Sequence, residues 1–171
     1  WEDAFSNGAS TVILQGINFE NVNLEKFEDK NIILVQDTIQ ALSDIATYKR
    51  NLYGKDFPLV GVTGSVGKTS TKDILASIVS RKFKVLKTQG NLNNHIGLPL
   101  TILKLKDHTA LVVEMGMNNL GEISTLTNIA KPTISVITNV GTSHIGNLGS
   151  RENILKAKLE ILEGMEIPKI I

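Results

Sequence analysis

The architecture of this chain follows from one stretch, Gly61-Val62-Thr63-Gly64-Ser65-Val66-Gly67-Lys68-Thr69-Ser70. The short apolar run at 58–62 predicts a buried strand ahead of it. Apolar residues recur at helical spacing over 74–79, so we expect a helix to begin near Lys68. In such a strand–loop–helix unit, glycines let backbone N–H groups turn toward a phosphate, and the helix N-terminus adds partial positive charge. The stretch therefore predicts a phosphate-binding loop.

Lys68 and Thr69 supply the chemistry of such a loop, because the lysine reaches the β- and γ-phosphates and the threonine hydroxyl binds Mg²⁺. The strict pattern G-x-x-x-x-G-K-[ST] requires glycine at position 62, where this chain has Val62. The shorter pattern G-x-x-G-K-T is complete from Gly64 to Thr69. An ordinary glycine-rich turn between a strand and a helix is the alternative interpretation.

Composition limits the class of protein. The chain has 171 residues, of which 42% are hydrophobic and 20% are charged, which is typical of a globular protein with one domain or one domain plus part of another. Its net charge of +1 gives no electrostatic footprint for nucleic acid. No apolar run approaches the length of a membrane span, and the absence of cysteine excludes a disulfide scaffold and fits a reducing cytosol. Because the chain starts with Trp1, we expect a fragment of a longer protein.

Two segments with different organisation are expected. Residues 1–55 read as part of a small α/β unit, with strands at 11–17 and 32–35 and a helix N-capped by Thr38, and they contain no catalytic constellation. From residue 56, strands at 83–86, 110–114 and 133–138 alternate with helices at 96–105, 121–129 and 150–163. This alternation predicts a parallel sheet covered by helices on both faces, with ligands at the carboxyl ends of the strands.

Polar residues follow several of these strands. Glu114 ends the strand at 110–114, where an acidic residue of a phosphate-loop protein binds Mg²⁺ directly or through water; a solvated carboxylate is the alternative. His144 lies in a polar loop after the next strand, and a lone histidine is usually structural or merely exposed. The amide-rich stretch at 91–94, which includes Asn93 and Asn94, could bind a sugar or a carboxylate, or could satisfy its own backbone as turn residues.

Lys158 interrupts the apolar face of the last predicted helix. One interpretation is a lysine that snorkels at the edge of the core. The other is a lysine held inward at an active site, with a pKa lowered by desolvation. The apolar positions of this helix are Ile154, Leu155, Leu159, Ile161 and Leu162, and its predicted solvent-exposed positions are Lys156, Glu160 and Glu163.

The chain resembles the Mur ligases, which are ATP-dependent amide ligases of peptidoglycan synthesis in the cytoplasm. Five spaced motifs occur in the order seen in that family: Thr63–Ser70, Gly90–Asn94, Glu114–Gly116, Asn139–His144 and Lys156–Lys158. Related folylpolyglutamate synthases share the loop but usually diverge at the other stretches. The Asn-Leu-Asn-Asn, Glu-Met-Gly and Lys-Ala-Lys stretches are most similar to the branch that joins D-Ala-D-Ala to a UDP-N-acetylmuramoyl tripeptide, with ATP as the energy source and an acyl phosphate as the intermediate.

The resemblance also implies cofactors and residue roles. ATP and Mg²⁺ are the implied cofactors, with one Mg²⁺ held by Thr69 and Glu114 and a second held or positioned by His144 and a carbamylated Lys158. The implied ATP-binding residues are Thr63, Gly64, Ser65, Val66, Gly67, Lys68, Thr69 and Ser70; the catalytic residues are Lys68, His144 and Lys158; and the substrate-binding residues are Asn93 and Asn94.

The family also implies a domain plan. Residues 1–55 correspond to the later part of a UDP-substrate-binding domain, residues 56–171 to the first part of the ATP-binding domain, and the C-terminal domain is absent, so the fragment is expected to be inactive alone. Another Mur-type or folylpolyglutamate-type ligase, or a non-catalytic nucleotide-binding module, remains an alternative. A GTPase is disfavoured because the chain has no guanine-reading [NT]-K-x-D and no D-x-x-G switch.

Overall fold

A computed structural model describes residues 1–16 and 28–166 of the chain. The described residues form two compact units, Trp1–Ala41 and Leu42–Ile171. The boundary between the units falls inside helix α2 (Thr38–Asn51), whereas the sequence places the functional boundary at residues 55 and 56. Among the described residues, none of the helices is both long and apolar enough to span a membrane.

The first unit contains helix α1 (Glu2–Ser6) and two parallel strands, β1 (Thr11–Leu14) and β2 (Asn31–Leu34), whose residues pair in register from Thr11 with Asn31 to Leu14 with Leu34. The sequence predicts that the first strand extends to residue 17, which lies outside the described residues, as does most of the polar stretch after it.

The cap predicted at the start of α2 is wrong. Asp37, and not Thr38, supplies the capping oxygen, because its Oδ1 accepts hydrogen bonds from the N–H groups of Ile39 (2.7 Å) and Gln40 (3.1 Å).

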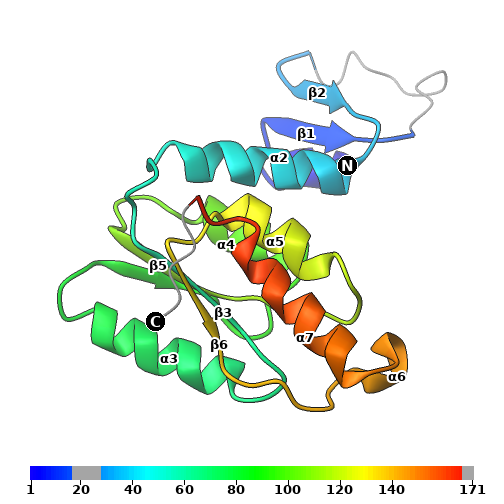
Figure 1. The fold of residues 1–171 in the computed structure, drawn as a ribbon. Helices are drawn as coiled ribbons and strands as arrows, with labels where there is room; N and C mark the ends of the chain where they lie inside the picture. The colour runs from blue at the N-terminus through cyan, green and yellow to red at the C-terminus, as the bar shows by residue number, and fades with distance from the viewer. Residues whose placement is uncertain (17–27, 167–171) are drawn as a thin grey trace. The chain divides into compact units, whose positions relative to one another are not determined.

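The second unit is a four-stranded parallel sheet with the strand order β4-β5-β3-β6. Figure 1 shows α3 on one side of this sheet and α4, α5 and α7 on the other, which confirms the predicted α/β architecture. Its elements are β3 (Leu59–Thr63), α3 (Lys68–Val79), β4 (Val85–Lys87), α4 (Gly97–Leu103), β5 (Ala110–Glu114), α5 (Glu122–Ala130), β6 (Ile134–Ile137), α6 (Ile145–Leu148), α7 (Arg151–Leu159) and the 3₁₀ turn η2 (Glu160–Leu162).

The two central strands, β3 and β5, are buried along their whole length because both faces of the sheet are covered. Alternate side chains of β5 enter different clusters. Leu111 and Val113 pack with α4, α5 and α7, whereas Val112 packs with Val62 and with Ala76 of α3. The continuous apolar runs of these strands are thus explained by burial on both faces.

The last helix differs from its predicted pattern. Leu155 and Leu159 are exposed, and Glu160, predicted to face solvent, is buried. The helix ends at Leu159 and tightens into η2, whose three residues per turn move Glu160 off the outer face. The Glu160 carboxylate accepts hydrogen bonds from the N–H groups of Gly121 (2.8 Å) and Ser124 (3.1 Å), so it caps the start of α5.

Candidate functional site

The predicted phosphate loop connects β3 to α3 and requires glycine at two places. Gly64 has φ 149°, and a Cβ there would lie 1.9 Å from Thr138 Oγ1. Gly67 has φ 81° and immediately precedes α3. Lys68 curls back over the loop, where its Nζ donates to the Gly64 carbonyl at 2.8 Å. The loop therefore presents the first N–H groups of α3, which have no acceptor within the helix, together with an ammonium group.

Thr138 and Asn139, which follow β6, hold this loop by hydrogen bonds. The N–H groups of Ser65 and Val66 donate to the main-chain oxygen and to Oδ1 of Asn139, both at 3.1 Å, and the Asn139 amide donates back to the Val66 carbonyl at 3.0 Å. Thr138 Oγ1 donates to the same carbonyl at 2.7 Å. Asn139 and Thr138 thus fix the loop, a role that the sequence signalled only by their position after a strand.

Glu114 is positioned beside the loop at the end of β5. Its carboxylate accepts a hydrogen bond from Thr69 Oγ1 at Oε2 and another from Asn93 Nδ2 at Oε1, both at 2.8 Å. Only 3% of the residue is exposed, which rules out the alternative of a solvated carboxylate. A hydroxyl oxygen and a buried carboxylate therefore meet at the carboxyl edge of the sheet.

The amide-rich stretch is held by protein contacts. Besides its side-chain bond to Glu114, Asn93 accepts a hydrogen bond at its main-chain carbonyl from the N–H of Gly116 (2.8 Å). Asn94 Oδ1 accepts from the N–H groups of Ile96 (3.2 Å) and Gly97 (2.8 Å) at the start of α4. Both amides thus have structural roles, and substrate binding by Asn93 and Asn94 stays a prediction.

Lys158 is buried, with 1% of its surface exposed, so it does not snorkel. Burial, and secondarily the nearby Lys68 cation, lowers the pKa of Lys158 to about 8. Within the described part of the chain its ammonium group makes no hydrogen bond or ion pair. The structure therefore places a second, electrostatically disfavoured amine close to the phosphate-loop lysine.

His144 follows β6 at the same edge of the sheet, but in the described part of the chain no hydrogen bond or ion pair joins its side chain to the other predicted residues. It precedes α6 with φ 65°, and its side chain is exposed. The neighbouring Ser143 contacts the loop, donating to the Ser65 carbonyl at 3.2 Å. No group of three or more His, Cys, Asp or Glu side chains suited to a metal occurs in residues 1–16 and 28–166. The structure thus joins Thr69 with Glu114 and brings Lys68 near Lys158, but it does not join His144 to either pair.

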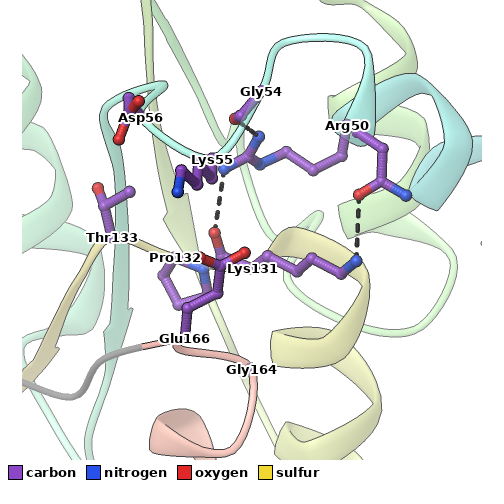
Figure 2. Close-up of a pocket in the computed structure, with 10 residues that line it drawn as sticks. Arg50, Gly54, Lys55, Asp56, Lys131, Pro132, Thr133, Gly164 and Glu166 are labelled. Atoms are coloured by element: carbon purple, nitrogen blue, oxygen red, sulfur yellow. Dashed lines mark hydrogen bonds between the residues drawn. The ribbon is translucent and has the colours of Figure 1, made fainter.

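The second unit has a pocket at each edge of its sheet. A cavity of about 270 Å³ at the carboxyl edge is lined by Asn94, His95, Gly116, Leu120, Gly121, Glu122, Thr125 and Leu126, which brings in His95, a residue to which the sequence assigned no role. A cavity of about 370 Å³ lies at the opposite edge, because its residues Asp56 and Thr133 precede β3 and β6. Figure 2 shows Arg50 in this second cavity, where its guanidinium donates to the carbonyls of Gly54 (2.8 Å) and Lys131 (3.1 Å).

Comparison with known proteins gives concordant results. The family model described as the Mur ligase middle domain matches residues 62–171. The UDP-N-acetylmuramoyl-tripeptide–D-alanyl-D-alanine ligase of Bacillus subtilis (strain 168) is 49% identical over 140 residues, which cover 81% of this chain and 30% of that protein. The ligase of the same name from Synechocystis sp. is 51% identical over 130 residues, which cover 75% of this chain and 28% of that protein. The chain therefore spans less than a third of the length of these relatives.

Solved structures agree. The MurF ligase of Thermotoga maritima in complex with ADP is similar with a TM-score of 0.83 and 36% identity, covering 96% of this chain and 36% of that one. A MurF structure from Acinetobacter baumannii has a TM-score of 0.78 and 32% identity, covering 94% of this chain and 40% of that one. With the phosphate loop, the Thr69–Glu114 contact and the family match over residues 62–171 all in agreement, the chain belongs to the Mur ligase family.

Proposed function

We propose that this chain is part of an ATP-dependent ligase that joins D-Ala-D-Ala to a UDP-N-acetylmuramoyl tripeptide through an acyl phosphate. The observation that carries the proposal is the hydrogen bond between Thr69 and Glu114, because it unites the phosphate loop with a carboxylate suited to a metal. The relatives at 49% and 51% identity, both named as ligases of this substrate pair, support the choice of substrates. A cytoplasmic location is part of the same proposal.

We infer a domain plan on the same basis. Residues 1–55 would form the later part of the domain that binds the UDP-linked substrate, and residues 56–171 would begin the ATP-binding domain. The match of the middle-domain model to residues 62–171 and the coverage of only 30% of the Bacillus subtilis ligase support this plan. The complete ligase would then include further domains that bind the incoming dipeptide.

Thr69 and Glu114 are the residues that we assign to a Mg²⁺ ion bound with the nucleotide. Both offer oxygen donors, which Mg²⁺ prefers. Because the Thr69 hydroxyl donates a hydrogen bond to Glu114, its oxygen lone pairs remain available, and the carboxylate can accept more than its two hydrogen bonds. The pair therefore fits the ion, which would supply positive charge to the phosphoryl group in transfer.

Lys68 and the loop would act on the phosphates directly. In the proposed reaction the carboxylate of the peptide attacks the γ-phosphate of ATP, ADP leaves, and the amine of D-Ala-D-Ala then displaces phosphate from the acyl carbon. Lys68 would leave the Gly64 carbonyl, 2.8 Å from its Nζ, to neutralise charge on the transferred phosphoryl group. The loop backbone, fixed by Asn139, would hold the phosphates in place without reorganising.

We assign Lys158 to act as a carbamate. Its ammonium form would repel a metal cation, whereas a carbamate offers two oxygens to it. With the pKa lowered to about 8, about a tenth of the amine is neutral at pH 7, and only this form attacks CO₂, joining nitrogen to carbon and releasing a proton. His144, at the same sheet edge with its side chain exposed, would help to hold or position a second Mg²⁺ near this group.

The first test is nucleotide binding by the 171-residue chain. Calorimetric titration with ADP should show binding that strengthens with Mg²⁺. Glu114→Gln should remove most of the Mg²⁺ effect, and Lys68→Ala should weaken binding at every Mg²⁺ concentration. Lys156→Met, which alters an exposed lysine on α7, is the matched control and should behave like wild type. ADP affinity that changes neither with Mg²⁺ nor with Glu114→Gln would contradict the assignment of Thr69 and Glu114 to Mg²⁺.

The second test uses the complete ligase. Phosphate release from ATP should require both the UDP-linked tripeptide and D-Ala-D-Ala, and the 171-residue chain alone should show little turnover. Lys158→Ala should lose activity and recover part of it with added acetate, which replaces the carbamate oxygens. Activity close to wild type without acetate would exclude the carbamate. Nucleotide binding without ligation in the complete protein would favour the alternative of a non-catalytic nucleotide-binding module.

A further inference from the structure

Lys72 is a buried lysine to which the proposed function assigns no role. It lies on α3, three residues after Thr69, and only 3% of it is exposed. Its Nζ donates to the Thr88 carbonyl at 2.9 Å and lies 3.1 Å from Asp73 Oδ1. Because burying a cation is unfavourable unless it is paired and hydrogen-bonded, these contacts decide where the side chain lies.

Thr88 connects Lys72 to Glu114. It follows β4, is fully buried, and is held at three atoms. Its carbonyl accepts from Lys72, its N–H donates to the Val112 carbonyl at 3.1 Å, and its Oγ1 accepts from the N–H of Glu114 at 3.0 Å. Thr88 therefore fixes the main chain of Glu114 at the point where β5 ends.

Helix α3 thus supports Glu114 in two ways. Thr69 holds the carboxylate directly at Oε2, and Lys72, on the same face of the helix three residues later, holds Thr88. The loop that follows Thr88 reaches Asn93, whose side-chain amide donates to the other oxygen of the Glu114 carboxylate, Oε1. Both ends of this loop therefore meet the same glutamate.

We propose that Lys72 is a positioning residue for the metal site. Through Thr88 it fixes the main chain and the loop that orient the Glu114 carboxylate against Thr69, and it thereby sets the affinity of the site for Mg²⁺. This inference rests on the proposed function, since it takes Thr69 and Glu114 as the Mg²⁺ ligands. Lys72 itself is too deeply buried to contact the nucleotide.

The test is calorimetric titration of the chain with ADP over a series of Mg²⁺ concentrations, compared with titration in EDTA. Residues that orient metal ligands typically contribute 10- to 100-fold to metal affinity, so Lys72→Met should raise the Mg²⁺ concentration for half-maximal effect by about 10-fold. ADP binding in EDTA should stay at the wild-type level, and Lys72→Arg should restore part of the Mg²⁺ response. The control is Lys84→Met, because Lys84 also pairs with an aspartate, Asp107, but both of these residues are exposed.

A purely structural role for Lys72 predicts a different result. Lys72→Met would then lower the free energy of unfolding and leave the Mg²⁺ dependence at the wild-type value, which overturns the inference. If Lys72→Met does not fold, Thr88→Val serves instead, because it removes the acceptor of the Glu114 N–H and must raise the Mg²⁺ requirement. An unchanged Mg²⁺ requirement in Thr88→Val also overturns the inference. Wild-type binding that ignores Mg²⁺ would instead refute the proposed function, so the two failures are distinguishable.

Discussion

Replacing Lys158 by methionine should stabilise the chain near neutral pH. The lysine is 1% exposed, and its pKa is lowered to about 8, chiefly by burial and secondarily by Lys68. The folded state therefore disfavours the charged ammonium. Methionine keeps a long unbranched side chain in the same space and removes the charge.

The magnitude follows from the pKa of the lysine. The unperturbed value is 10.5 and the value in the folded chain is about 8. At 1.36 kcal/mol per unit, this difference corresponds to a penalty of up to about 3 kcal/mol. Below pH 8 the amine is protonated in both states and the whole penalty applies. Between pH 8 and 10.5 the unfolded chain binds more protons than the folded chain, so the stability of the wild type rises with pH.

Urea unfolding followed by circular dichroism from pH 7 to pH 10 measures this effect. Lys158→Met should be the more stable protein at pH 7, and its advantage should shrink as the pH rises above 8. Lys156→Met, an exposed position two residues away on the same helix, should show no such trend. The reasoning is refuted if Lys158→Met is less stable than wild type at pH 7, or if its advantage does not change with pH.

Four further substitutions test other parts of the structure. Gly64→Ala should lower the free energy of unfolding by more than about 2 kcal/mol and abolish ADP binding, because its Cβ would meet Thr138 Oγ1 at 1.9 Å. Gly67→Ala has open space at its Cβ and should lower the free energy of unfolding by only about 1–2 kcal/mol. Urea unfolding measures both changes in stability. Glu160→Ala should cost about 1 kcal/mol in the same assay, because α5 loses its capping carboxylate, and an unchanged midpoint would contradict that role. Asn93→Ala should raise the Mg²⁺ requirement of ADP binding by about 10-fold, whereas a residue that binds only substrate would leave it unchanged.

The sequence could predict the central strands and the phosphate loop because local patterns determine them. The run that ends at Glu114 is apolar throughout, and burial on both faces of the sheet requires that pattern. The start of α3 at Lys68 follows from the glycines and from the helical spacing behind them. For Lys158 the sequence leaves two interpretations, and its burial excludes the snorkelling one, whereas its role in an active site stays a prediction.

The remaining contacts depend on residues that are distant in the sequence. Nothing local distinguishes Lys72 from an exposed helical lysine, since its acceptor, Thr88, lies on another element. A helical period extended through Glu160 predicts that it faces solvent, whereas the structure changes to a 3₁₀ turn there. For His144 the sequence motif predicts the edge of the sheet at which the residue lies, but it does not determine where the side chain points.

The bond between Glu160 and the start of α5 restricts changes in length near Lys158. Lys158 and Glu160 are separated by one position and both are buried, and Glu160 is in addition held by the N–H of Gly121. Inserting or deleting a single residue between them would turn one relative to the other by about 100° about the helix axis, so that only one could keep its place. We therefore expect substitutions of the exposed Leu159 to be tolerated better than any change in the spacing between Lys158 and Glu160.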